Sequence, residues 1–176
     1  MPATRLRSVL LTDLLGPVHA RVLAPPDAGV EVRDLAYDSR TVTPGALFLC
    51  VPGATTDGHD HAAAAIAAGA GALLVERELA LDVPQAVVPS VREAMGPIAD
   101  AFFGHPTAQL TLLGVTGTNG KTTTAYLQHA ILVAAGRATG LLGTIERRIG
   151  GAVEPAVRTT PEAGGLHRDF RRMADA

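Results

Sequence analysis

Short apolar runs alternate with helical patterns over the first hundred residues of the chain. Runs of strand length occupy residues 30–37, 46–51, 72–76 and 85–88. An alanine-rich helix is expected at residues 60–70, with Asp57 or Asp60 capping its start. A further helix is expected after Ser90, because Ser90 and Glu93 have the spacing of a capping box. This order of elements predicts a small α/β domain.

The pattern restarts after the sequence Gly104-His105-Pro106, which is the best candidate for a linker. The expected elements beyond it are a strand at residues 110–115, a helix at residues 122–135 ended by Gly136, a strand at residues 139–147, a turn at residues 149–152 and a helix with Thr160 as N-cap and Pro161 in its first turn. We therefore predict two domains, residues 1–107 and 108–176. Two parallel strands are too few to stand alone, so the second domain is expected to be incomplete.

Composition narrows the classes of partner. The chain of 176 residues is 47% apolar, 18% charged and has a formal net charge of −2, which predicts a globular protein without a basic face for nucleic acid. No apolar run approaches the roughly 18 residues of a membrane span, so we expect no membrane partner and a cytoplasmic location. The single cysteine, Cys50, excludes an intrachain disulfide and is expected to be a small buried hydrophobic residue.

A strand, a glycine-rich turn, a Lys-Thr pair and a helix follow one another, which is the order that phosphate binding requires. The amides of such a loop point at an anion, Lys121 can reach the β- and γ-phosphates, and the Thr122 hydroxyl can ligate Mg²⁺. The expected ATP-binding residues are Gly117, Thr118, Asn119, Gly120, Lys121, Thr122 and Thr123. The alternative is a glycine-rich turn with an incidental lysine. The general motif has glycine where this chain has Val115, and the glycines fall instead at positions 114, 117 and 120.

With this glycine spacing, residues 114–123 resemble the ATP loop of the Mur ligases, the ATP-dependent amide-forming enzymes of peptidoglycan precursor synthesis. Residues 38–48 and 57–60 resemble the opening motifs of the uridine-nucleotide-binding domain of that family. Residues 140–145 and 158–163 resemble the member that adds the third amino acid, diaminopimelate or lysine, to UDP-MurNAc-L-Ala-D-Glu. The resemblance extends from about Leu35 to Ala163.

The resemblance implies an α/β fold in which residues 1–107 bind UDP-MurNAc-L-Ala-D-Glu and residues 108–176 begin a P-loop parallel-sheet ATPase domain. It also implies that Lys121 is catalytic and that ATP and Mg²⁺ are the cofactors. The implied substrate contacts are Tyr37, Ser39, Ala54, Thr55, Thr56, Arg158, Thr159 and Thr160. Ser39 and Thr160 also fit simpler roles in a turn and a helix cap, and Arg40 is a partner for either a phosphate or Asp38.

The resembled reaction needs parts that this sequence does not show. Lys121 is the only lysine, so the modified lysine of the family's central domain has no candidate. We therefore expect an N-terminal portion that is inactive alone and that has the remainder of the ligase as a partner. The alternatives are a non-catalytic module that binds a UDP-sugar and a nucleotide, or an unrelated small P-loop ATPase or kinase. His59 and His61 are not expected to form a metal pair, since residues two apart on a helix project to different faces.

Overall fold

The computed structural model describes residues 8–23, 29–156 and 162–176. The chain divides into two compact units, Met1–Phe102 and Phe103–Ala176, here called the N-terminal and C-terminal units. Within the described residues, no helix is both long enough and apolar enough to cross a bilayer.

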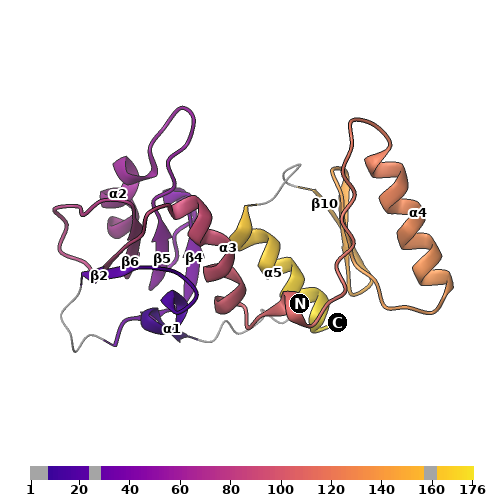
Figure 1. Ribbon diagram of the computed structural model, residues 1–176, viewed down its shortest axis with the longest axis horizontal. Helices are drawn as coiled ribbons and strands as arrows, with labels where there is room; N and C mark the ends of the chain where they lie inside the picture. The colour runs from indigo at the N-terminus through magenta and orange to yellow at the C-terminus, as the bar shows by residue number, and fades with distance from the viewer. Residues whose placement is uncertain (1–7, 24–28, 157–161) are drawn as a thin grey trace. The chain divides into compact units, whose positions relative to one another are not determined.

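The N-terminal unit is built on a five-stranded sheet in the order β2-β7-β6-β5-β4 (Figure 1). Its strands are β2 (Arg21–Leu23), β4 (Asp34–Ala36), β5 (Ala46–Leu49), β6 (Ala72–Val75) and β7 (Gln85–Val87). Strands β4 to β7 pair in parallel, and β2 is antiparallel to β7 at the edge. The α/β fold with a parallel sheet is therefore confirmed.

The expected strand at residues 30–37 is divided between two sheets. Its first part is β3 (Glu31–Val32), which pairs with β1 (Val9–Leu10) in a separate two-stranded sheet. Its second part is β4, the edge strand of the five-stranded sheet. Periodicity did not predict this division, because both parts have the same alternating pattern and only the partner strands differ.

The helices of the N-terminal unit include some that start at a capping side chain and some that do not. They are α1 (Leu11–Leu15), the 3-10 helices η1 (Ser39–Thr41) and η2 (Gly58–His61), α2 (Ala62–Ala67) and α3 (Val91–Phe102). Asp57 caps η2, so the expected helix at residues 60–70 starts as a tighter 3-10 turn. The Ser90 hydroxyl accepts a hydrogen bond from the amide of Glu93 at 3.2 Å, as the capping box predicts.

The core of the N-terminal unit covers both faces of the sheet, because every residue of β5 and β6 is buried. Alternate residues point to opposite faces, and Phe48, Leu73 and Val75 pack with Ala62 and Ala65 of α2. Cys50 belongs to the same cluster and is fully buried, as expected. Burial raises the pKa of the Cys50 thiol to about 12.

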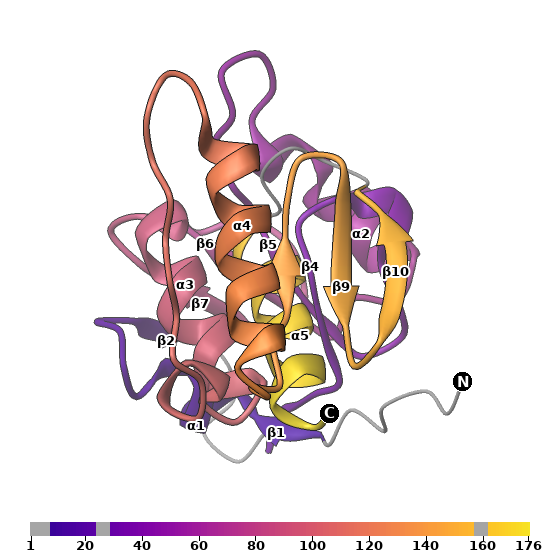
Figure 2. The same cartoon turned by 90° about the vertical axis from the view of Figure 1, so that its right-hand side faces the viewer.

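The C-terminal unit contains a small antiparallel sheet with a helix on each side. Its elements are η3 (Pro106–Ala108), α4 (Lys121–Ala134), β8 (Leu141–Leu142), β9 (Glu146–Ile149), β10 (Ala152–Pro155) and α5 (Ala163–Ala174). The strand order is β10-β9-β8, with both pairs antiparallel. Figures 1 and 2 together show α4 on one side of this sheet and α5 on the other.

The two strands predicted for this unit are wrong in detail. Residues 110–115 belong to no strand, and Leu112 and Leu113 are 49% and 62% exposed. Residues 139–147 contain β8 and the start of β9, which pair in antiparallel fashion. A parallel strand requires a partner from elsewhere in the chain, and none of the described residues supplies one for residues 110–115.

Local turn chemistry explains the pairing that does form. The turn at residues 149–152 is confirmed: Gly150 and Gly151 have φ values of 55° and 80° and join β9 to β10 in a two-residue hairpin. Positive φ at both positions suits a type I′ turn, which glycine adopts without strain. The last helix, α5, starts after Glu162 as N-cap, later than expected. The expected cap, Thr160, and Pro161 lie outside the described residues.

Candidate functional site

The glycine-rich segment leads directly into the exposed N-terminus of α4. Gly120 is the N-cap residue and has a φ of 77°, while Gly117 has a φ of 146°. Both values favour glycine and allow the main chain to turn sharply before the helix. Residues 116–121 are exposed, so the amides at the start of α4 face solvent with the positive end of the helix dipole. The loop and the start of α4 thus have features that anion sites at helix N-termini use.

Lys121 and Thr122 occupy the first two positions of α4. The Lys121 ammonium donates to the carbonyl oxygens of Gly117 and Thr118 at 2.6 and 3.1 Å, so it lies across the loop. The Thr122 hydroxyl lies 3.4 Å from the hydroxyl of Thr144, which follows β8. Thr144 was not among the expected site residues, although residues 140–145 carried part of the family resemblance.

The fit of Mg²⁺ rests on the Thr122 hydroxyl. Among the described residues there is no group of three or more His, Cys, Asp or Glu side chains that could hold a metal ion. Mg²⁺ keeps several waters, takes further oxygens from nucleotide phosphates and is usually also bound by one or two protein carboxylates, so the Thr122 hydroxyl would supply only part of the protein's contribution. The residues present are compatible with a nucleotide-bound Mg²⁺.

In the N-terminal unit, two groups of expected substrate residues follow neighbouring parallel strands. Tyr37 and Ser39 come directly after β4, and Ala54, Thr55 and Thr56 come after β5. Strands β4 and β5 are parallel neighbours, so both groups lie at the carboxyl edge of the sheet. Open α/β sheets bind ligands at this edge. The expected third group, Arg158, Thr159 and Thr160, lies outside the described residues.

Arg40 contacts Asp38, which was one of the two partners left open. Its Nε and an Nη atom donate to the two carboxylate oxygens at 2.9 and 2.7 Å. Asp38 also accepts from the amide of Arg40 at 3.0 Å and caps η1. The hydrogen bond to Asp38 raises the pKa of the Arg40 guanidinium. This fork holds the turn that carries Ser39.

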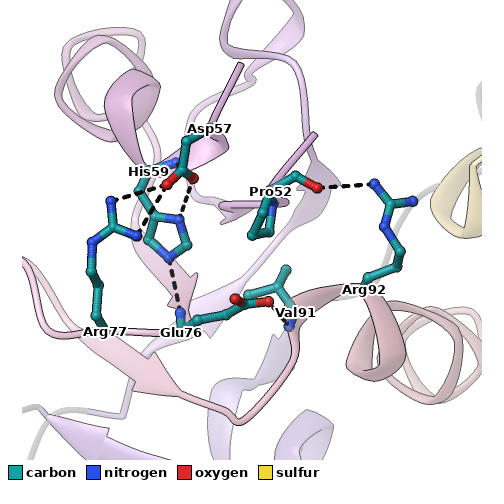
Figure 3. Close-up of polar contacts among 7 residues, drawn as sticks. All are labelled: Pro52, Asp57, His59, Glu76, Arg77, Val91 and Arg92. Atoms are coloured by element: carbon teal, nitrogen blue, oxygen red, sulfur yellow. Dashed lines mark hydrogen bonds and ion pairs between the residues drawn. The ribbon is translucent and has the colours of Figure 1, made fainter. Parts of the chain in front are cut away.

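A cluster around His59 was missed by the sequence reasoning. The His59 side chain is fully buried, and its Nδ1 lies 2.6 Å from a carboxylate oxygen of Asp57 (Figure 3). Its Nε2 accepts a hydrogen bond from the amide of Glu76 at 2.9 Å. Arg77 donates twice to the second Asp57 oxygen, at 3.0 Å each. His61 is exposed. The partners of His59 are up to 17 residues away, so spacing gave no signal for the cluster.

Hydrogen bonding within this cluster controls the charge of Asp57. The main-chain amide and then the imidazole of His59 donate to its carboxylate, and Arg77 adds a smaller contribution. Together they lower the pKa of Asp57 from 3.8 to about 2. Asp57 is therefore a carboxylate at neutral pH, held in place by the residues that it caps.

These two units define a class: an α/β protein with a largely parallel sheet in one unit and a glycine-rich loop at the start of a helix in the other. Comparison with known proteins identifies the family. Residues 31–103 match the Mur ligase family, catalytic domain, and residues 115–176 match the Mur ligase middle domain. The chain belongs to the Mur ligase family.

Curated relatives share high sequence identity with the chain. It is 52% identical over 141 residues to the UDP-N-acetylmuramoyl-L-alanyl-D-glutamate–2,6-diaminopimelate ligase of Geobacillus thermodenitrificans (strain NG80-2), covering 80% of this chain and 29% of the relative. It is 42% identical over 165 residues to the ligase of the same name from Bacillus velezensis, covering 94% of this chain and 34% of the relative. The chain thus spans about a third of the length of these relatives.

Solved structures agree on the fold. One solved structure is of a UDP-N-acetylmuramoyl-L-alanyl-D-glutamate–2,6-diaminopimelate ligase. The match covers 96% of this chain and 34% of the solved chain, with a TM-score of 0.68 and 22% identity. Another is the UDP-N-acetylmuramoylalanyl-D-glutamyl-2,6-diaminopimelate–D-alanyl-D-alanyl ligase of Acinetobacter baumannii. The match covers 75% of this chain and 30% of the solved chain. Its TM-score is 0.59 at 28% identity.

Proposed function

We propose that this chain is the N-terminal portion of a cytoplasmic ligase that adds diaminopimelate to UDP-MurNAc-L-Ala-D-Glu in peptidoglycan precursor synthesis. The names of the curated relatives support this reaction, and they favour diaminopimelate over lysine. The residues alone left that choice open. Because the chain spans 29% to 34% of those relatives, the complete reaction would require the remainder of the ligase as a partner.

In this proposal the N-terminal unit, with residues to about 107, holds the sugar nucleotide. Tyr37, Ser39 and the loop residues Ala54, Thr55 and Thr56 contact the uridine nucleotide at the carboxyl edge of the sheet. Arg158, Thr159 and Thr160 hold the muramoyl-peptide portion. The position of the first two groups after β4 and β5 supports the assignment, since both lie where a parallel sheet binds ligands.

Residues 108–176 supply part of the ATP site. Residues 117–123 hold the phosphates, Lys121 neutralises charge on the transferred phosphoryl group, and Thr122 contributes to a nucleotide-bound Mg²⁺, which supplies further charge neutralisation. The substrate carboxylate takes the γ-phosphoryl group of ATP to give an acyl phosphate and ADP. The amine of the incoming amino acid then displaces phosphate and forms the amide. The contribution of the protein is positioning and electrostatic stabilisation.

The chain alone is expected to bind these ligands without turnover. No residue of α4 is buried, and Leu127 and Ile131 on that helix are 59% and 66% exposed. A helix with this much exposed apolar surface lacks the layer that would normally cover it. This observation favours the second candidate, a binding module, for the isolated chain.

The observation that carries the proposal is the exposed loop from Gly117 to Lys121 at the start of α4, in a chain whose two curated relatives described above share one ligase name. Isothermal titration of the chain with UDP-MurNAc-L-Ala-D-Glu and with Mg-ATP tests it. We expect both to bind, and no phosphate release when both are present with diaminopimelate. Binding of ATP without the UDP-sugar would contradict the proposed sugar-nucleotide site, and membership of the Mur ligase family already argues against an unrelated ATPase or kinase. Phosphate release would show that the isolated chain is already a complete catalyst.

A further inference from the structure

The loop that carries Ala54, Thr55 and Thr56 has a closed base. Pro52 and Asp57 form an isolated antiparallel bridge, and the Gly53 amide donates to the carbonyl of Thr56 at 2.9 Å. The Gly58 amide donates to the carbonyl of Val51 at 3.0 Å. Residues 53–56 beyond this base are exposed. The loop is therefore a short projection whose direction is set at residues 52 and 57.

Main-chain packing under the loop leaves no room for a side chain at position 58. A Cβ atom added at Gly58 would lie 2.5 Å from the Val51 nitrogen, 2.7 Å from the Val51 oxygen and 2.8 Å from the Cys50 carbonyl carbon. Gly58 thus lets the returning chain pass directly against the end of β5. The next residue, His59, is consequently placed beneath the loop.

Two chains of hydrogen bonds tie the base of the loop to the start of α3 (Figure 3). On one side, Arg92 of α3 donates to the Pro52 carbonyl at 3.2 Å. On the other side, Asp57 contacts His59, and the His59 ring accepts from the amide of Glu76. The Glu76 carboxylate then accepts from the amide of Val91, the first residue of α3, at 2.9 Å. Both ends of the loop base are fixed to one helix.

The two hydrogen-bond partners of the His59 ring fix which of its nitrogens carries the proton. Because Nε2 accepts from the Glu76 amide, the ring proton of a neutral imidazole is on Nδ1, where it donates to Asp57. One buried ring therefore bonds at once to the main-chain amide that follows β6 and to a carboxylate at the base of the loop. Phe, which is similar in size, would provide neither bond.

We propose that His59 is a positioning residue for sugar-nucleotide binding: through Asp57 it sets the direction of the loop that presents Ala54, Thr55 and Thr56 to the uridine nucleotide. This role rests on the proposed function, because it requires that the loop contact the nucleotide. Arg92 fixes the opposite end of the same base through Pro52, and its removal has the same kind of effect.

The test compares His59→Asn, His59→Phe and Arg92→Leu in the chain of 176 residues, with His61→Gln, at an exposed position, as the matched control. Asn retains a donor near the position of Nδ1, so it keeps the bond to the loop. It cannot reach the Glu76 amide. Affinity for UDP-MurNAc-L-Ala-D-Glu is measured by titration, the unfolding temperature by circular dichroism, and amide exchange at residues 53–58 by mass spectrometry.

We expect His59→Phe and Arg92→Leu to weaken binding about tenfold, His59→Asn by no more than about threefold, and His61→Gln not at all. His59→Asn and His59→Phe should both lower the unfolding temperature, so affinity and stability separate between them. Exchange at residues 53–58 should rise in the variants that bind weakly. If His59→Phe does not fold, the affinity of Arg92→Leu still tests whether the base of the loop must be fixed.

Three outcomes overturn the proposal, and they do so in two different ways. If the unaltered chain binds the UDP-sugar and Arg92→Leu and the folded His59 variants bind equally well, the loop needs no positioning and only the role of His59 is wrong. The same holds if affinity falls strictly in parallel with unfolding temperature, because His59 is then structural alone. If the unaltered chain binds no UDP-sugar, the proposed function fails and this role fails with it.

Discussion

The ammonium of Lys121 donates a hydrogen bond to the carbonyl oxygen of Gly117 at 2.6 Å, across the loop that joins them. A second bond, to the carbonyl oxygen of Thr118 at 3.1 Å, fixes the charge over the same turn. The positive end of α4 and the lysine charge therefore belong to the same short loop and helix start. An anion bound there would meet both at once, which is the arrangement that phosphates require.

Replacement of Lys121 by Met should weaken binding of Mg-ATP by about ten- to a hundredfold, because a hydrogen bond to a charged group contributes about 1.5–3 kcal/mol. Titration calorimetry measures the change. Arg137→Met is the matched control: it removes one exposed positive charge just beyond α4, and we expect affinity within about twofold of the unaltered chain. Equal losses in both variants would mean that general charge, not the loop, attracts the nucleotide.

Local signals in the sequence predicted the parts of the fold that local chemistry determines. The capping residues Asp57 and Ser90 and the paired glycines at 150 and 151 all act within a few residues of their own position, and the structure confirms each of them. The candidate loop was recognisable for the same reason, because its glycines, lysine and threonines are contiguous.

The failures concern pairing between distant segments. The apolar run at residues 110–115 predicts burial, but pairing depends on a neighbour that no described residue provides. His59 was set aside because its spacing from His61 does not suit a metal, whereas its distant partner, the amide of Glu76, directly follows β6. Such contacts arise when the sheet brings strand ends together, which residue spacing does not reveal.

Gly58→Ala should destabilise the N-terminal unit by about 1–3 kcal/mol, since the added methyl group would overlap the main chain at Val51 and neither side can move freely. Gly96→Ala is the control, and it should change the free energy of unfolding in the opposite direction. Nothing lies within 4 Å of a Cβ atom at Gly96, which is inside α3, so alanine should stabilise by about 0.5–1 kcal/mol. Urea unfolding followed by circular dichroism gives both values. A neutral Gly58→Ala would mean that the end of β5 yields at low cost.

Acid should weaken the N-terminal unit through Asp57. Its pKa is lowered to about 2 in the folded chain from an ordinary value of 3.8, so the folded state binds a proton less readily than the unfolded state. The resulting stabilisation is complete above about pH 4 and is lost as the pH falls from about 4 toward 2. Urea unfolding at a series of pH values should show this loss in the unaltered chain.

Asp57→Asn isolates the contribution of this one carboxyl group. The variant should be less stable than the unaltered chain at pH 6, and the difference should narrow steadily below pH 4 as Asp57 takes up its proton. Other carboxyl groups titrate equally in both proteins and cancel in the difference. A difference that stays constant down to pH 2.5 would show that the charge of Asp57 does not stabilise the fold.

The segment at residues 110–115 should exchange its amide hydrogens rapidly in this chain, because it belongs to no ladder and Leu112 and Leu113 are largely exposed. An apolar run that leads into a phosphate loop is expected to become a buried parallel strand when neighbouring strands are present. The chain matches the Geobacillus relative over only 29% of that relative's length, so such strands can be supplied in a chimera. We expect residues 110–115 to become strongly protected when the chain is joined to the rest of that relative's sequence.

The exposed Leu127 and Ile131 of α4 should become buried in the same chimera, which binding of a hydrophobic dye would report. Strong protection of residues 110–115 in the isolated chain would contradict the prediction, as would continued rapid exchange in a folded, active chimera.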